Sequence, residues 1–403
     1  MIGPMKKLII YCLIFCCLLI VTFSCKNIPE NTEPSPLSEI FVDHHYLTKS
    51  IDASTMIDTS YHQFINLETN DSCLIGEIGR IVMRNDKIII YDSLVKQVLV
   101  FNLDGSFHSK VAAVGQGPDE YPPIVNDCFI GDQFIGILVP VINKIKLYDF
   151  DGDFVKEISL GGSWGTTYFT FDEQSYFLIN DWSTSEQGSF RFFAFDEGNT
   201  RMDKYLPFDM NTFEDRGWGL DNHYTIYDDH ALIIYSTNDT IYQITESMAG
   251  IEPLFRINIP NNKLSEELIK GNGRDALMAS IESGKITGIV NIAETSSYII
   301  LTTSNYNYLF YNKKTKEVES FTKSLTMPQW GDFSIGWNRS FIQDDTIISS
   351  FSPSIVMFVM KDWLEEAEFS DKSFEKEIRK ATDALKDETD NPIILIQRFL
   401  QES

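Results

Sequence analysis

The feature that most constrains the fold is a β-rich unit that occurs twice at a spacing of 47 residues. The first copy runs from Lys87 to Val111 and the second from Gln133 to Leu160. In both copies two strand-like runs lead into a hairpin signal, Asp104-Gly105 or Asp151-Gly152, and a further strand-like run follows. Short β-rich runs with such turns at a fixed spacing predict a four-stranded unit that is repeated along the chain.

Four weaker copies of this unit follow. Their strand-like runs lie at 175–180, 191–196 and 204–208; at 230–235, 240–245 and 254–259; at 297–302, 308–312 and 318–322; and at 345–351 and 355–360. Six such units predict an all-β fold, a six-bladed β-propeller. The last copy lacks an outer strand, and the segment from Tyr61 to Leu67, ahead of the first copy, can supply it and leave the ring without a free edge.

Two segments interrupt the strand pattern and have apolar residues at helical spacing. Residues 263–285 begin with a helix-start signal at Ser265, which predicts an inserted helical loop. Residues 362–386 and 392–400 read as amphipathic helices, with Asp362 as the expected N-cap of the first. We therefore expect the propeller over residues 41–361 and a C-terminal helical segment over 362–403.

The N-terminus has the profile of an export signal. Lys6 and Lys7 form a basic head, and residues 8–23 are apolar without any charge. This run is shorter than the roughly 20 residues of a spanning helix, and it ends at Ser24-Cys25, which resembles the cleavage box of bacterial lipoprotein precursors. We expect a signal peptide over residues 1–24, lipid on Cys25 and a flexible tether over 25–40, where Pro, Asn, Ser and Thr are frequent.

The net charge of the chain makes some classes of partner unfavourable. Without the signal the chain has 31 basic and 58 acidic residues, a net charge of −27, so nucleic acid and anionic lipid surfaces are poor partners. We expect the only membrane contact to be through the N-terminal lipid.

The cysteine content excludes two kinds of site. In the folded part only Cys73 and Cys128 remain, which excludes a disulfide framework and zinc-ligand spacing. These two cysteines either pair or serve as small buried hydrophobic side chains.

The region from Lys87 to Leu160 resembles the propeller lipoproteins of Bacteroidetes, whose blades are similar to those of NHL-repeat propellers. The loop from Gly115 to Tyr121 matches the family's Gly-Gln-Gly-Pro-Gly-Glu-Tyr motif except at Asp119, where the family has glycine. The resemblance implies a six-bladed propeller in the cell envelope, as an outer-membrane lipoprotein facing either the periplasm or the exterior. It implies the fold and the compartment more than an activity, because this family is largely without assigned activity.

The chain contains no recognisable motif for catalysis or cofactor binding. No Gly-x-Ser-x-Gly nucleophile elbow occurs, and the six histidines have no metal-ligand spacing, so we expect no metal and no cofactor. Carboxylates gathered on the axis of a propeller cannot be recognised by spacing. A carbohydrate-active hydrolase or lyase, with acids near the axis, therefore stays an alternative to a protein that does not catalyse a reaction.

Tryptophans indicate a binding face. On the strand assignment above, Trp164, Trp218 and Trp330 fall in connections between blades, Trp182 falls in a loop between the second and third strands of a blade, and Trp337 lies nearby. Such loops emerge on one face, where indoles beside polar groups suit sugars or peptides. Packing between blades is the other explanation for these indoles. The candidate ligand-binding residues are Trp164, Trp182, Trp218, Trp330, Trp337, Arg339, Glu120 and Tyr121.

The function expected from the sequence is therefore a membrane-anchored envelope lipoprotein whose propeller face binds a glycan or a protein partner. Two alternatives remain: the carbohydrate-active enzyme, and a structural subunit of an outer-membrane assembly. An exposed apolar patch on the terminal helices would favour assembly.

Overall fold

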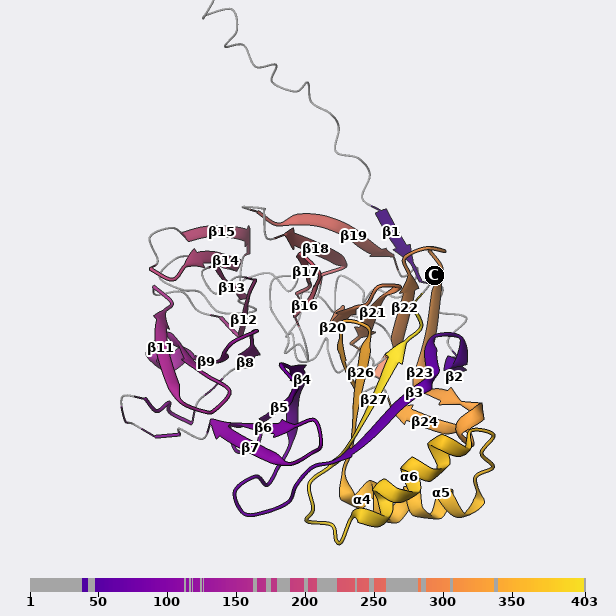
Figure 1. Cartoon of the computed structure of the whole chain (residues 1–403). Helices are drawn as coiled ribbons and strands as arrows, with labels where there is room; N and C mark the ends of the chain where they lie inside the picture. Colours follow the sequence, from indigo (N-terminus) through magenta and orange to yellow (C-terminus); the bar gives the residue numbers. More distant parts are fainter. Residues whose placement is uncertain are drawn as a thin grey trace, which may run out of the picture. The chain divides into compact units, whose positions relative to one another are not determined.

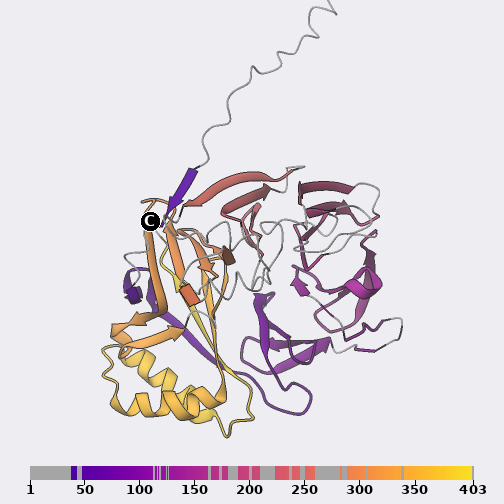
Figure 2. The same cartoon turned by 180° about the vertical axis from the view of Figure 1, so that it is seen from behind.

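The structure is a computed structural model (Figures 1 and 2). It describes residues 38–42, 48–111, 114–115, 117, 119–123, 125, 127–161, 165–171, 175–179, 189–198, 202–208, 223–235, 238–245, 250–258, 282–283, 288–304, 307–336 and 340–401. Residues 39–403 belong to one compact unit. The chain folds as an all-β propeller with short helices near the C-terminus, and its described strands form six sheets.

The two clear copies of the repeat form the first and second sheets, each with four antiparallel strands in sequence order. The first sheet contains β4 (Ile78–Arg84), β5 (Lys87–Asp92), β6 (Gln97–Asn102) and β7 (Phe107–Val111), and the second contains β8 (Asp127–Ile130), β9 (Ile135–Val139), β10 (Lys144–Tyr148) and β11 (Phe154–Ser159). The equivalence extends to the register, because both third strands have an irregularity at the same place, Val100/Phe101 and Leu147/Tyr148. The repeated unit is confirmed.

The next three sheets follow in chain order. The third contains β12 (Thr167–Thr170), β13 (Ser175–Ile179), β14 (Phe190–Asp196) and β15 (Met202–Pro207); the fourth contains β16 (Tyr224–Tyr227), β17 (His230–Ile233), β18 (Thr240–Thr245) and β19 (Glu252–Asn258), with β1 (Ser38–Phe41) at its edge; the fifth contains β20 (Ile289–Glu294), β21 (Tyr298–Thr303), β22 (Tyr308–Asn312) and β23 (Val318–Met327), extended by β2 (Thr48–Asp52) and β24 (Phe333–Gly336). The predicted helical loop at 263–285 lies outside the described residues, apart from Glu282 and Ser283. The predicted number of six blades is not confirmed for the whole ring, parts of which lie outside the described residues.

The sixth sheet joins the two ends of the unit. Its strands are β25 (Ser340–Gln343), β26 (Thr346–Phe351), β27 (Ile393–Phe399) and β3 (Ile57–Asn66), in that order. Figure 1 shows β3, from the start of the unit, beside β27, from its end. The prediction that the segment before the first copy supplies the outer strand of the last one is confirmed.

Two predicted elements near the C-terminus are wrong. Ile355–Met360, predicted as a strand, is helical: α4 (Pro353–Ile355) begins after Ser352, and a π-helical turn (Val356–Met360) continues it. Residues 392–400, predicted as a helix, instead contain β27, in which six of seven residues are buried. An apolar run that is buried on both faces suits a central strand, and β-branched Ile393, Ile394 and Ile396 favour it further.

The predicted helices over residues 362–386 are confirmed as α5 (Lys361–Glu366) and α6 (Lys372–Ala384). Asp362, the expected N-cap, instead lies in the first turn of α5, whose N-cap is Met360. Asp371 is the N-cap of α6 and accepts hydrogen bonds from the backbone of Ser373 and Phe374. The buried face of α6 packs on β3 and on the short 3-10 turn Pro328–Trp330 (Figure 1). These helices therefore cover one side of the closing sheet.

Candidate functional site: a lysine-bearing pocket between the first two sheets

The connection from β7 to β8 contains the Gly115–Tyr121 motif and is fastened to both neighbouring sheets. The Tyr121 ring is buried, and its hydroxyl donates to the carbonyl of Lys96 in the first sheet at 2.8 Å. Tyr148 of the second sheet donates to the carbonyl of Asp119, also at 2.8 Å. Within the loop, the Gly115 amide donates to the Tyr121 carbonyl. The motif therefore holds the first two sheets in position relative to each other.

Glu120 closes this loop on itself. Its Oε2 accepts the Gly117 amide at 2.7 Å, and a Cβ on Gly115 would lie 1.9 Å from the same oxygen. Only glycine therefore fits at position 115 while Glu120 keeps this position. Asp119, where the related family has glycine, has no positive φ, so this departure from the family motif introduces no backbone strain.

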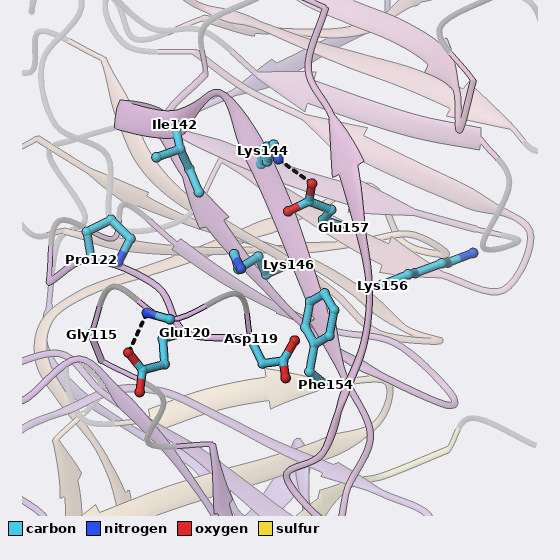
Figure 3. Close-up of a pocket in the computed structure, with 11 residues that line it drawn as sticks. Gly115, Asp119, Glu120, Pro122, Ile142, Lys144, Lys146, Phe154, Lys156 and Glu157 are labelled. Atoms are coloured by element: carbon cyan, nitrogen blue, oxygen red, sulfur yellow. Dashed lines mark hydrogen bonds and ion pairs between the residues drawn. The ribbon is translucent and has the colours of Figure 1, made fainter.

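A cavity of about 780 Å³ lies between this loop and the outer strands β10 and β11 (Figure 3). Its size is within the range of small-molecule sites. The lining combines an aromatic ring and aliphatic side chains with ammonium and carboxylate groups. The lining residues are Gly115, Gly117, Asp119, Glu120, Pro122, Ile142, Lys144, Lys146, Phe154, Lys156 and Glu157.

Lys146 is the unusual residue of this pocket. It is only 4% exposed, and its Nζ lies 5.0 Å from the centre of the Phe154 ring, in cation-π range. In the register of the second sheet Lys146 faces Glu157, and the equivalent residues of the first and third sheets, which face Lys110 and Lys204, are Leu99 and Phe193. Both are fully buried. A lysine therefore occupies a position that the neighbouring sheets fill with apolar side chains, and a buried charge is unfavourable unless it is compensated.

The ammonium groups of Lys144 and Lys156, the other two lysines of the pocket, point in different directions. Lys144 forms an ion pair with Glu157, and Figure 3 shows both groups beside the cavity. Lys156 lines the cavity with its stem, while its Nζ points away from it and pairs with Glu197 Oε2 at 3.0 Å. Lys144 and Lys146 thus supply the donors of the pocket, and Asp119, Glu120 and Glu157 supply its acceptors.

A second polar cluster joins the first strands of four sheets. Arg80 on β4 donates to the Tyr224 hydroxyl on β16 at 3.0 Å and pairs with Asp127 on β8 at 3.1 Å. Thr167 on β12 donates to the other oxygen of Asp127. Burial lowers the pKa of Arg80, but Asp127 and Tyr224 outweigh this effect and keep it charged; burial raises the pKa of Tyr224 to about 12. Residue spacing does not predict this cluster, because its members lie far apart in the chain.

The structure places the ligand-binding residues predicted from the sequence in different environments. Glu120 lines the pocket. Trp330 is completely buried against Phe374, and its Nε1 donates to Asp371, so the prediction that it offers a ligand-binding surface is wrong; its ring is needed to pack α6. Tyr121 is likewise buried, so the prediction that it binds a ligand is wrong, and its role is structural. The remaining candidates lie outside the described residues: Cys25, Trp164, Trp182, Trp218, Trp337 and Arg339.

Cys73 and Cys128 are both buried free thiols, so the alternative in which they pair is excluded. Burial raises the pKa of Cys128 well above its usual value, which leaves the unreactive thiol form. Within the described part of the chain, no group of three or more His, Cys, Asp or Glu side chains is arranged to hold a metal ion. None of the described helices is long and apolar enough to span a membrane.

Solved structures share this fold. A candidate exported protein from Bacteroides fragilis NCTC 9343 has a TM-score of 0.68 at 18% identity, over 90% of this chain and 100% of that one. A member of the DUF4221 family from Bacteroides vulgatus ATCC 8482 has a TM-score of 0.50 at 10% identity, over 85% and 97%. A virginiamycin B lyase from Staphylococcus aureus reaches only 0.39 at 16% identity, over 65% and 74%, which supports no argument about function.

Comparison with curated proteins found no match. A family model, described as "Domain of unknown function (DUF4934)", matches residues 37–398. This match contains the closing strand β3, both copies of the repeat, the pocket and most of β27. The chain therefore belongs to the DUF4934 family.

Proposed function

We propose that this protein is a lipid-anchored protein of the cell envelope that binds a glycan in the pocket beside the Gly115–Tyr121 loop, without catalysing a reaction. The observation that carries the proposal is Lys146, a buried lysine at a position where the neighbouring sheets have Leu99 and Phe193. At this position the neighbouring sheets have apolar side chains, so the lysine gives the pocket an ammonium group that the packing of a blade does not require.

The mixture of groups in the pocket favours a glycan over other ligands. Sugar hydroxyls both donate and accept hydrogen bonds, so they complement the ammonium group of Lys146 and the carboxylate of Asp119 together. The Phe154 ring offers a flat apolar surface of the kind on which the C–H face of a sugar packs. A strongly anionic ligand would meet three carboxylates, and a strongly cationic one would meet the lysines.

The N-terminal sequence supports the proposed export and lipid anchoring of the protein. The basic head, the uncharged run and Ser24-Cys25 support a signal peptide with lipid on Cys25. The candidate exported protein of Bacteroides fragilis supports the same compartment for this chain. We place the protein in the outer membrane on the grounds of its resemblance to propeller lipoproteins with NHL-like blades.

A glycan array probed with residues 26–403, which contain the whole compact unit, tests the binding proposal. Lys146→Met keeps the length of the side chain but removes the charge, and Phe154→Ala removes the ring; each should weaken binding about tenfold or more. Phe107→Ala is the matched control, because Phe107 has the position of Phe154 in the first sheet, packs on Phe101 as Phe154 packs on Tyr148, and does not line the cavity.

Equal affinity of the Lys146→Met and Phe107→Ala variants for the bound glycan would refute the proposed site. Thermal unfolding of each variant separates loss of binding from loss of the fold. Cleavage of a bound glycan would instead support the carbohydrate-active hydrolase or lyase.

A further inference from the structure

Exposed apolar side chains gather at one edge of the first two sheets. The hairpin from β5 to β6 exposes Leu94 by 67% and Val95 by 53%, and the equivalent hairpin from β9 to β10 exposes Val141 by 51% and Ile142 by 40%. These two pairs are 47 residues apart and therefore belong to the repeat. Val114 in the connection after β7, and Leu74 ahead of β4, are also exposed. We call these six residues the apolar rim: Leu74, Leu94, Val95, Val114, Val141 and Ile142.

Hydrogen bonds join Leu74, the first hairpin and the loop that bears Val114. Leu74 is joined to the first hairpin, since its carbonyl accepts from the Gln97 side chain at 3.2 Å. The same hairpin is joined to the loop that bears Val114, since the Tyr121 hydroxyl donates to the Lys96 carbonyl and Val114 pairs with Tyr121. Isolated exposed apolar side chains are common, but a connected group of them marks a binding surface.

The apolar rim is continuous with the pocket. Ile142 belongs to both, and Val114 directly precedes Gly115, which lines the cavity. Figure 3 shows Ile142 on the opposite side of the cavity from Asp119 and Phe154. A ligand whose polar part lies among Lys146, Asp119 and Phe154 can therefore extend past Ile142, along aliphatic side chains.

We infer that the ligand is an amphipathic glycoconjugate, with its sugar in the pocket and an alkyl or acyl chain along the apolar rim. This inference rests on the proposed function and specifies its ligand class. A sugar alone would leave the rim in water, and an apolar partner alone would make no contact with the polar groups of the cavity. The continuity of the two surfaces through Ile142 favours one ligand that contains both parts.

Titration of residues 26–403 with methyl and octyl glycosides of glucose, galactose and mannose, below micelle formation, tests the inference. This chain carries no lipid, so no detergent competes with the probes. A buried methylene group tightens binding about three- to fourfold, and partial burial of the chain should make each octyl glycoside that binds about tenfold or more tighter than its methyl counterpart. In the Leu94→Ser/Val141→Ser variant this gain should vanish, with the affinity for the methyl glycoside unchanged.

The double variant Phe358→Ser/Val359→Ser is the matched control, because this pair is exposed by 63% and 60% on the C-terminal helical turn, outside the rim. It should keep the gain. Equal affinity for methyl and octyl glycosides would overturn the inference while leaving the sugar site in place. A gain that survives in the rim variant, or that octanol alone reproduces, would also overturn it. Failure of every methyl glycoside and every array glycan to bind would overturn the proposed function itself.

Discussion

The indole ring of Trp330 lies flat against the phenyl ring of Phe374, with 4.2 Å between the ring centres and 5° between their planes. The same indole donates its N–H to Asp371, the residue that caps α6. One side chain from the turn between β23 and β24 thus contacts both the buried face and the N-cap of α6. The position of α6 on the closing sheet depends on this arrangement.

Trp330→Ala should lower the free energy of unfolding by about 3–5 kcal/mol, the range for removal of a large buried side chain. Urea denaturation measures this change. Phe358→Ala, on the neighbouring helical turn and 63% exposed, is the control and should change stability by less than about 0.5 kcal/mol. Similar small losses in both variants would contradict the packing role of Trp330.

Arg80→Met should lower the free energy of unfolding by about 2–4 kcal/mol, because it leaves the Asp127 carboxylate without its cation among the first strands of the sheets. The pair is partly exposed, at 21% and 12%, so we expect less than the full cost of breaking a buried ion pair. Adding Asp127→Asn should recover part of this loss. A double variant with the summed loss of the two single variants would show that the two side chains do not interact.

Two buried tyrosines should respond in opposite ways to removal of the hydroxyl. The Tyr168 hydroxyl has no hydrogen-bond partner within the described residues, so Tyr168→Phe should leave stability unchanged or raise it by up to about 1 kcal/mol. The Tyr121 hydroxyl donates to the Lys96 carbonyl, so Tyr121→Phe should lower stability by about 1 kcal/mol. Chemical denaturation of the two variants side by side would contradict this account if their order were reversed.

His230 gives a pH dependence of known sign. A hydrogen bond to the nearly buried Glu294 raises the pKa of His230, with a smaller contribution from Asp229, against the opposing effects of burial and Lys313. A folded-state pKa above the unfolded value stabilises the protein fully below about pH 6.5, and this contribution is lost as the pH rises through the folded pKa. Between about pH 6 and pH 8 the wild type should therefore lose more stability than His230→Gln. Parallel pH profiles of the two proteins would contradict the prediction.

The repeat made most of the fold predictable. Matching Asp104-Gly105 with Asp151-Gly152 indicated the first two sheets, and both glycines have the positive φ that such hairpins need, +87° and +92°. The two C-terminal errors share a cause. Short apolar runs fit a buried strand and a buried helix about equally, so the sequence does not show that Ile393–Phe399 pairs in the sixth sheet while Ile355–Met360 is helical.

The candidate site was predicted only in part. Glu120 was found through the family motif, whereas Lys146 was missed, although placing it beside Leu99 in the first copy of the repeat would have revealed a lysine at a core position. Trp330 was misassigned because an indole serves equally well for ligand contact and for packing. The contacts of Arg80 with Asp127 and Tyr224 depend on how the sheets are arranged around the ring. Residue spacing in the sequence does not predict this arrangement.

The pairing of β3 with β27 sets an order of events for the newly made chain. Asn391, just before β27, donates to the carbonyl of Cys73, a residue 318 positions earlier. Contacts of such long range form late, because the intervening chain has to be ordered first. Until the last residues are synthesised, the edge of β3 stays unpaired and open to wrong strands. A protein that crosses a membrane from its N-terminus onward would thus complete its ring only after translocation ends, so C-terminal truncation before β27 should yield aggregation and not a smaller propeller.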